Sequence, residues 1–417
     1  MLESELSEEK LYAPELIDSL EGENWLKEIR KEAISTAQEV KFPTGQQEKW
    51  RYSPIHKLKL EDYELLDHKP ENPEIRNSEI ALSPSNFVEI NDGYLTSRTN
   101  SEEYDVLHIS QMGSPFEFKV GIDFFSQLNL ALSPDPIVIK VERNTSVKEP
   151  IYVYNNLTVE QAITFPKLHF EIESGANVSI VEIFQSDNLR CVSIPETKIS
   201  VGDGANVKYQ QVQNIGQNVW QIGNLDVSVG QQATFDGATV GIGGAYARME
   251  SHCRLIGRGA TGNLSAIYHG TGEQILDYRT YQEHVGRDTQ SNLLFKGVLD
   301  DQATSIYTGL IRVHKDASGT NAYQTNRTIK LSEQTLAESV PNLEIENNDV
   351  RCSHASTVSP VDDDQRFYLE TRGIPSEIVD TLIVRGFINE VVQKLPVTEA
   401  NEWILSLLSD KQNLENP

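Results

Sequence analysis

The chain has 417 residues, and its 36 Lys and Arg against 62 Asp and Glu give a formal net charge of −26. So acidic a chain repels nucleic acid and anionic lipid, and neither is an expected partner. No stretch approaches the roughly 18 uninterrupted apolar residues of a membrane helix, and the opening MLESELSEEKLYAPEL lacks the basic and apolar regions of a signal peptide, so a cytoplasmic protein is expected.

Residues 1–115 are predicted to form a helical and mixed N-terminal region. Apolar residues of ENWLKEIRKEAISTAQEV recur at three- and four-residue steps, which predicts a helix ending near residue 40. The segment FPTGQQEKWRYSPI (42–55) contains Pro and Gly and interrupts the helical pattern. Short strands and loops are expected from 56 to 115.

Residues 116–362 are predicted to be a β-rich core. Short runs such as IVIKVERN, PIYVYNNLTV and NVSIVEIFQS alternate apolar and polar residues, as strands do. The segment SGANVSIVEI recurs as DGANVKYQQV and, with lower similarity, as VGQQATFDGA and RGATGNLSAI. The aligned glycines are Gly175, Gly204, Gly230 and Gly259. A turn glycine with a positive φ followed by a strand, repeating every 20–30 residues or so, favours a β-solenoid. An antiparallel sandwich or barrel with glycine turns is the alternative.

Residues 363–417 are predicted to form a C-terminal helical module. The segment 376–395 carries a wider apolar arc than the roughly 100° stripe that packing within one domain needs. Leu382, Phe387 and Ile388 are therefore candidate partner-binding residues. Packing of the surplus apolar surface against the core or the helix containing Trp403 is the alternative explanation.

Several short motifs fit structural roles better than catalytic ones. The chain has no Gly-x4-Gly-Lys-Ser/Thr segment, and its single Gly-x-Gly-x-x-Gly (257–262) leads into a predicted strand and not into the helix of a dinucleotide site. His284 and Asp288 could form a base and its orienting carboxylate, but no nucleophile motif accompanies them. The aspartates 362–364 fit a helix N-cap better than a metal cluster.

The three cysteines, Cys191, Cys253 and Cys352, lie far apart without a Cys-x-x-Cys motif, which disfavours a disulfide framework or a zinc knuckle. His252 and Cys253 are adjacent, so on a strand they face opposite ways. Cys352 and His354 are two residues apart, so on a strand they face the same way and could bind one ion or cluster. Two ligands do not complete a site, and a purely structural role remains the alternative.

Longer segments identify a family. NLLFKGVLDD, TNAYQTNRTIKLSE, PNLEIENNDVRCSHASTVSPVDDDQRFYLETRGIP and VRGFINEVV resemble, in this order, the C-terminal half of the SufB/SufD family of iron–sulfur cluster assembly proteins. The N-terminal EKWRYSPI resembles SufD in particular. The motif series is long and covers residues 280–395 strongly, with weaker similarity back to residue 120.

The resemblance implies a right-handed parallel β-helix with helical modules at its N- and C-terminal sides. It also implies a non-catalytic scaffold subunit that binds no cofactor by itself and carries an iron–sulfur cluster transiently in a complex. Its partners would be a SufB-like paralogue and a SufC-like ATPase docked on the C-terminal helices. Cys352 and His354 would then lie at the SufB–SufD interface, as cofactor-binding or metal-binding residues.

The sequence departs from both branches after His354. SufB-like chains read His-Glu-Ala there and SufD-like chains His-Gly-Ala, whereas this chain reads His354-Ala355-Ser356. The departure leaves room for a homodimer. Two other hypotheses are a β-helix enzyme acting on polysaccharide and a purely structural β-helix subunit with no ligand role for Cys352 or His354.

Overall fold

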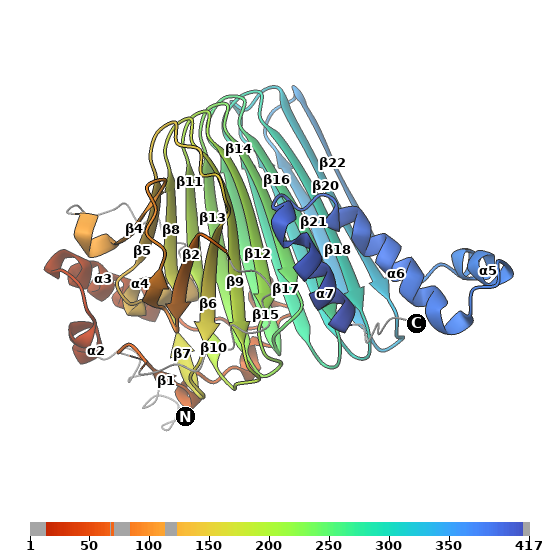
Figure 1. Ribbon diagram of the computed structural model, residues 1–417, viewed down its shortest axis with the longest axis horizontal. Helices are drawn as coiled ribbons and strands as arrows, with labels where there is room; N and C mark the ends of the chain where they lie inside the picture. The colour runs from red at the N-terminus through yellow and green to blue at the C-terminus, as the bar shows by residue number, and fades with distance from the viewer. Residues whose placement is uncertain (1–13, 67, 71–83, 113–122, 412–417) are drawn as a thin grey trace.

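The computed structural model describes residues 14–66, 68–70, 84–112 and 123–411, and it shows a parallel β-helix with helices from both ends of the chain packed on its outside (Figure 1). The chain winds through about eight turns, and successive turns add strands to two facing sheets. The predicted parallel β-helix is thus confirmed, and the antiparallel alternative is wrong for the core. Within the described ranges, no helix has the length and apolar character needed to cross a membrane.

Strands of one sheet alternate along the chain with strands of the other, and pairing between successive turns is parallel and in register. Two antiparallel pairs occur at the N-terminal end of the β-helix. One joins β2 (Phe87–Asn91) to β3 (Tyr94–Arg98), and the other joins β4 (Asp105–His108) to β5 (Ile137–Val141). The 12-stranded sheet, called sheet A here, contains β1 (Glu64–Leu65), β4 (Asp105–His108), β5 (Ile137–Val141), β7 (Ala162–Thr164), β8 (Lys167–Ile172), β10 (Val192–Ser193), β11 (Glu196–Val201), β13 (Trp220–Val229), β15 (Tyr246–Leu255), β17 (Ile275–His284), β19 (Thr304–Val313) and β21 (Leu336–Ile345). The 10-stranded sheet, sheet B, contains β2 (Phe87–Asn91), β3 (Tyr94–Arg98), β6 (Ile151–Leu157), β9 (Asn177–Ser186), β12 (Asn206–Asn214), β14 (Thr234–Gly241), β16 (Thr261–Gly270), β18 (Gln290–Leu299), β20 (Thr320–Lys330) and β22 (Val350–Pro360).

One corner of each turn needs a residue with a positive φ. The strand register places seven such residues above one another along the corner: Asn144, Gly175, Gly204, Gln232, Gly259, Asp288 and Gly319. The positive φ predicted for the repeat glycines is confirmed at Gly175, Gly204 and Gly259, whose φ values are 73°, 67° and 70°. The alignment of Gly230 is corrected, because the equivalent position in that turn is Gln232, with φ 52°.

Helices from the N-terminal part pack around one part of sheet A. These are α2 (Pro14–Ser19), α3 (Asn24–Val40) and α4 (Phe124–Leu132). They form a core with the short strands β7 and β10, and α3 packs along α4. All nine residues of α4 are buried, and this short helix lies in a part of the chain where only strands were expected, so it was not predicted.

The predicted boundary at residue 116 lies in 113–122, outside the described residues. Before it, β2, β3 and β4 already belong to the two sheets, so the N-terminal region contributes strands to the β-helix as well as helices. The predicted boundary at 362/363 falls between the end of β22 at Pro360 and the start of α5 at Asp363.

The C-terminal helices are α5 (Asp363–Thr371), α6 (Ser376–Val392) and α7 (Asn401–Lys411). Helices α6 and α7 cover the outer face of sheet B. Apolar side chains of α6 and α7, with Trp403 among them, form one core with outward-facing residues of β6, β9, β12, β14, β16 and β18. The wide apolar arc of α6 is therefore used largely within the chain.

Candidate functional site

The β-helix ends in an open turn. Among the described strands, β21 and β22 are the last of their sheets, and each pairs with one neighbour only. Several large apolar side chains on these strands are exposed, with Leu336 at 52%, Ile345 at 42% and Val358 at 39%. This end therefore presents unpaired backbone groups together with apolar surface, which is the surface that edge strands use to pair with another chain.

Cys352 and His354 both lie on β22, at this end. Cys352 packs against Ile311 and Val313 of β19, so it faces the interior between the sheets. The hydroxyl of Ser356 donates to that of Ser339 on β21 at 2.7 Å, so Ser356 also faces the interior. His354 lies between these two on the same face of the strand and is exposed because no further turn covers it. The predicted same-face arrangement of Cys352 and His354 is confirmed.

Partial burial raises the pKa of the Cys352 thiol above its usual value, although a hydrogen bond from the Ala322 backbone opposes this effect. The thiol is therefore the dominant form at neutral pH, and conversion to the thiolate that binds metals needs a nearby cation or metal ion. Cys191 and Cys253 differ from it in being fully buried, which raises the pKa of each thiol to about 12.

The interior of the β-helix becomes polar toward the open end. In successive turns of sheet B, the interior position occupied by His354 is occupied by Leu264, Leu293 and Gln324. On the next interior position, Asn326 donates to the Ser339 hydroxyl at 2.9 Å. The last turns therefore carry polar side chains at interior positions and do not continue the apolar core.

A thiol and an imidazole on one strand face are soft and borderline donors that suit iron–sulfur species. Within the described ranges, no group of three or more His, Cys, Asp or Glu residues has a geometry that could hold a metal ion. Cys352 and His354 thus make an incomplete donor set in this chain.

The remaining candidates have structural roles. Both nitrogens of His284 are used, at 2.8 Å from the Thr289 hydroxyl and 2.9 Å from that of Ser291, and burial lowers its pKa to about 4. Asp288 occupies a positive-φ corner and pairs with Arg258 at 2.9 Å. They form no base–carboxylate pair.

Other sequence motifs behave as expected. Cys253 faces the interior, whereas His252 faces outward and stacks on Tyr281 with ring centroids 4.2 Å apart. The glycine motif at 257–262 joins strand β15 to strand β16. The Asp362 side chain caps α5 by accepting from the backbone N–H groups of Asp364 and Gln365, as predicted.

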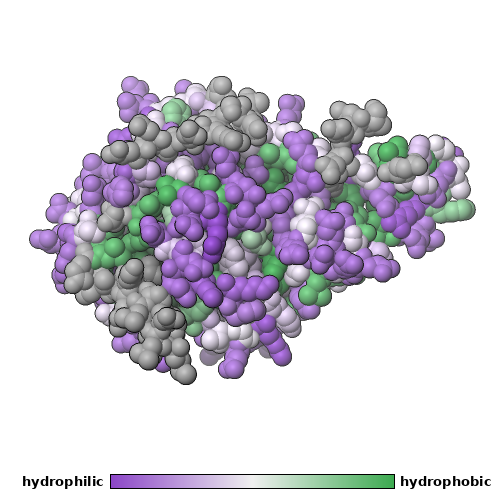
Figure 2. Space-filling model, turned by 90° about the horizontal axis from the view of Figure 1, so that it is seen from below, coloured by the Kyte–Doolittle hydropathy of each residue, from purple (hydrophilic) through white to green (hydrophobic). Residues whose placement is uncertain are grey.

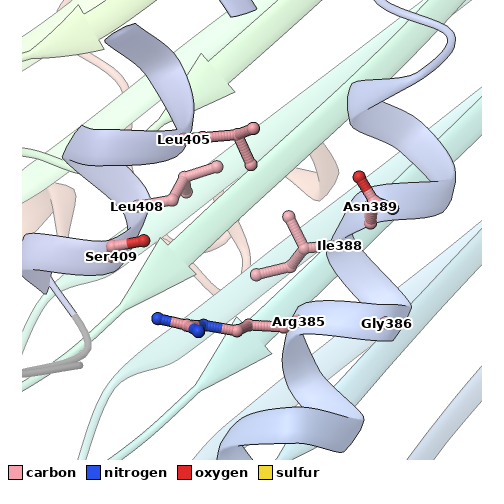
Figure 3. A pocket seen from close by; sticks show the side chains of 7 residues that line it. All are labelled: Arg385, Gly386, Ile388, Asn389, Leu405, Leu408 and Ser409. Carbon is pink, nitrogen blue, oxygen red and sulfur yellow. The ribbon is translucent and has the colours of Figure 1, made fainter. Parts of the chain in front are cut away.

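A second feature is a groove between α6 and α7 (Figure 3). Leu405, Leu408 and Ser409 of α7 face Arg385, Ile388 and Asn389 of α6 across a volume of about 450 Å³. Leu405 is 39% exposed, and the guanidinium of Arg385 lies at one end of the groove. An apolar groove with a cation at its end fits an apolar side chain that is followed by an acidic one.

The three predicted partner-binding residues occupy different environments. Leu382 is 39% exposed, and Phe387 is partly buried with the ammonium of Lys296 at 4.2 Å from its ring centre. Ile388 is only 4% exposed and packs on sheet B. Most of the surface of Ile388 is thus already used within the chain, and its role in docking stays a prediction, as do those of Leu382 and Phe387.

Helix α5 projects from the body at the C-terminal end of the β-helix (Figure 1). None of its residues is buried, and Phe367 and Tyr368 are 68% and 58% exposed. Seen from below, the surface is largely hydrophilic, but hydrophobic residues also show on the projection at the right (Figure 2). Its link to α6 is the pairing of Arg366 with both carboxylate oxygens of Asp380, at 2.6 and 2.7 Å.

Comparison with known proteins identifies the family. Residues 155–387, more than half of the chain, match the family described as SUF system FeS cluster assembly, SufBD core domain. The chain belongs to the SufB/SufD family. It is similar to SufD of Bacillus subtilis, with 25% identity covering 98% of this chain and 99% of that protein. An iron–sulfur cluster assembly SufBD family protein of Mycobacterium tuberculosis is 29% identical over 88% of each chain, and SufD of Escherichia coli is 24% identical over 89% of each.

Membership of the SufB/SufD family places the chain in iron–sulfur cluster assembly by the SUF system. It also disfavours the polysaccharide-active enzyme considered for the fold alone. The identities to the two SufD proteins agree with the resemblance of this chain to the SufD branch.

The structure shows what the SufD-like EKWRYSPI segment does. Trp50 is buried, and the guanidinium of Arg248 on β15 lies 3.9 Å from its ring centre. Arg248 also donates to the Lys49 carbonyl at 3.0 Å and pairs with buried Asp277 at 2.8 Å. The segment fastens the N-terminal region to the outer face of sheet A, a role that the motif itself does not indicate.

Proposed function

We propose that this chain is a SufD-like, non-catalytic scaffold subunit of the SUF assembly complex. It pairs through the open end of its β-helix with a SufB-like paralogue or with a second copy of itself. A SufC-like ATPase docks on its C-terminal helices, and a nascent iron–sulfur cluster is held transiently at the pairing interface with the help of Cys352 and His354.

The observation that carries this proposal is the open last turn. Among the strands that the structure describes, β21 and β22 have no neighbour on their outer side, and both carry exposed apolar side chains. Native proteins normally block such edges, since they promote association. A partner that continues the sheets would cover this edge and enclose His354.

Cys352 and His354 support the cluster role through their chemistry. They form a same-face thiol–imidazole pair on the last strand of sheet B, and they do not complete a metal site in the described chain. A partner chain would supply the remaining donors. The raised pKa of Cys352 fits a ligand that becomes a thiolate only when metal or a partner's positive charge arrives.

The cluster role is tested by reconstituting clusters in the assembled complex with His354→Ala and Cys352→Ser. We expect normal folding and complex formation with reduced cluster yield, read from the visible absorption of the complex. Ser353→Ala is the matched control, since Ser353 lies between them on β22 with its side chain on the opposite face. Parental cluster yield in both variants would mean that the two residues are structural.

The ATPase-docking role is supported by exposed apolar surface on the C-terminal helices. Leu382, Leu405 and Phe367 are exposed on α6, α7 and α5, although α6 and α7 otherwise pack firmly on sheet B. The ATPase would bind this remaining surface.

Deletion of the helices would expose the apolar face of sheet B, so point substitutions give a cleaner test. We expect Leu405→Glu and Leu382→Glu each to weaken ATPase binding at least tenfold, measured by calorimetry, because each would place a charge in an apolar contact. Glu399→Ala, an exposed change before α7, is the control. Unchanged binding in both leucine variants would place the ATPase elsewhere.

A further inference from the structure

Gln324 is a buried side chain without an observed partner. It lies on β20, is 2% exposed, and neither its amide nitrogen nor its amide oxygen has a hydrogen-bond partner among the described residues. A buried polar group left unpaired costs free energy, and most such groups in folded proteins are satisfied. An amide with both ends free therefore makes a hydrogen-bond partner within reach of Gln324 worth identifying.

The position of Gln324 is set by the strand register. Its Cα is paired with that of His354 on the neighbouring strand, and both side chains face the interior. Adjacent strands lie about 4.8 Å apart, so the amide of Gln324 is within reach of the imidazole one turn above it.

A glycine across the interior makes room for this side chain. A Cβ added to Gly309 of β19 would lie 2.1 Å from the amide nitrogen of Gln324. Any larger residue at position 309 would displace the amide, so Gly309 leaves the space that the Gln324 side chain occupies next to the turn that carries His354.

The neighbouring polar groups are already engaged. The Asn326 amide donates to Ser339, and the Ser356 hydroxyl donates to the same serine. Among these interior side chains next to His354, the Gln324 amide oxygen is the acceptor without a donor. A histidine that binds a metal through one nitrogen almost always donates its other N–H to such an acceptor, which fixes the tautomer and the ring orientation.

We propose that Gln324 is a positioning residue for His354. Its amide oxygen accepts the N–H of one imidazole nitrogen and so leaves the other nitrogen free, with its lone pair directed toward the open end. The inference rests on the proposed role of His354 as a cluster ligand, but the hydrogen bond itself needs no cluster: it is not formed in the structure, and a side-chain rotation of the exposed His354 would form it.

The test reads the tautomer of His354 by NMR on the full chain labelled with ¹⁵N-histidine. The His354 signals are assigned by their loss in His354→Ala, and the tautomer ratio follows from the two ring nitrogen shifts. Gln324→Met keeps the size of the side chain but removes the acceptor, and we expect it to shift the ratio about fivefold toward the other tautomer. Gln324→Glu keeps an acceptor oxygen and should preserve the parental tautomer.

Gln282→Met is the matched control, because Gln282 is another buried interior glutamine, on β17, whose in-register neighbour on β19 is Ile311 and not His354. It should leave the His354 signals unchanged. A parental tautomer ratio in Gln324→Met would overturn the proposal, as would the same shift in Gln282→Met.

Cluster formation is measured separately on the same variants in the assembled complex. A tautomer shift in Gln324→Met, combined with parental cluster yield in His354→Ala, would keep the positioning contact and reject the cluster role of His354. An unshifted tautomer ratio in Gln324→Met, combined with a low cluster yield in His354→Ala, would reject the positioning contact and keep the cluster role of His354.

Discussion

Gly204 offers a direct test of the left-handed corner in the β-helix. Its φ is 67°, and a Cβ placed on it would have no atom within 4 Å. A substitution there therefore meets no neighbour, and the cost comes from the backbone conformation alone. A left-handed conformation costs an L-residue about 1–2 kcal/mol, and a β-branched residue more.

We expect Gly204→Ala to lower the free energy of unfolding by about 1 kcal/mol and Gly204→Val by about 2 kcal/mol. Gly204→Asn should lie between Ala and the parent, since Asn adopts this conformation more readily. A chain of this size would lose only about 1 °C of melting temperature per kcal/mol, so a urea titration followed by circular dichroism is the better assay. The Val variant should shift its midpoint by about 0.5 M.

Gly386 on α6 is the matched control. A Cβ there also meets nothing within 4 Å, but the residue is helical. Gly386→Ala should therefore stabilise the chain by about 0.5–1 kcal/mol, because glycine is unfavourable inside a helix. If Gly204→Val unfolds at the parental urea concentration while Gly386→Ala shows its gain, the corner is not a strained position and the argument fails.

Two further predictions concern buried titratable groups. Burial raises the pKa of Glu182 from 4.5 to about 7. Between these two pH values the folded chain keeps a proton that the unfolded chain releases. The free energy of unfolding should therefore fall by on the order of 3 kcal/mol as the pH rises from 4.5 to 7. Glu182→Gln should remove that slope from urea titrations at a series of pH values, and an unchanged slope would assign it to other groups. The second prediction concerns the three thiols. Cys352 should react with a maleimide in the folded chain at a rate that rises with pH, whereas Cys191 and Cys253 should react only after unfolding. Mass spectrometry of the labelled peptides measures the order of labelling, and labelling of Cys253 before Cys352 would contradict the prediction.

Features that repeat along the sequence could be predicted, whereas contacts between residues of neighbouring turns could not. Regular turn glycines and strand alternation favoured a β-solenoid, the family resemblance implied the parallel β-helix, and the two-residue spacing predicted the shared face of Cys352 and His354. The corner at Gln232 was missed because a non-glycine residue occupies it, and α4 was missed because it is a short helix inside a segment rich in strand patterns. The pairing of Gln324 with His354 depends on the register between neighbouring turns, which local periodicity does not contain.

Burial by tertiary packing also explains why Ile388 has little free surface. The apolar arc of α6 was correctly recognised, but an arc alone does not say which side is covered. The β-helix offers an apolar outer face on sheet B, and Ile388 takes part in covering it, while Leu382 stays exposed. Candidate docking residues on such a helix therefore have to be taken from the part of the arc that the sheet does not reach.

The two proposed interaction surfaces are connected through short contacts. Helix α5 begins at Asp363, directly after β22 ends at Pro360, and Arg366 joins α5 to Asp380 of α6. The buried ammonium of Lys296 on β18 donates to the Phe387 carbonyl of α6 at 2.9 Å and to Glu390 at 2.6 Å. These contacts hold α6 to β18, the strand that pairs with β20, which carries Gln324.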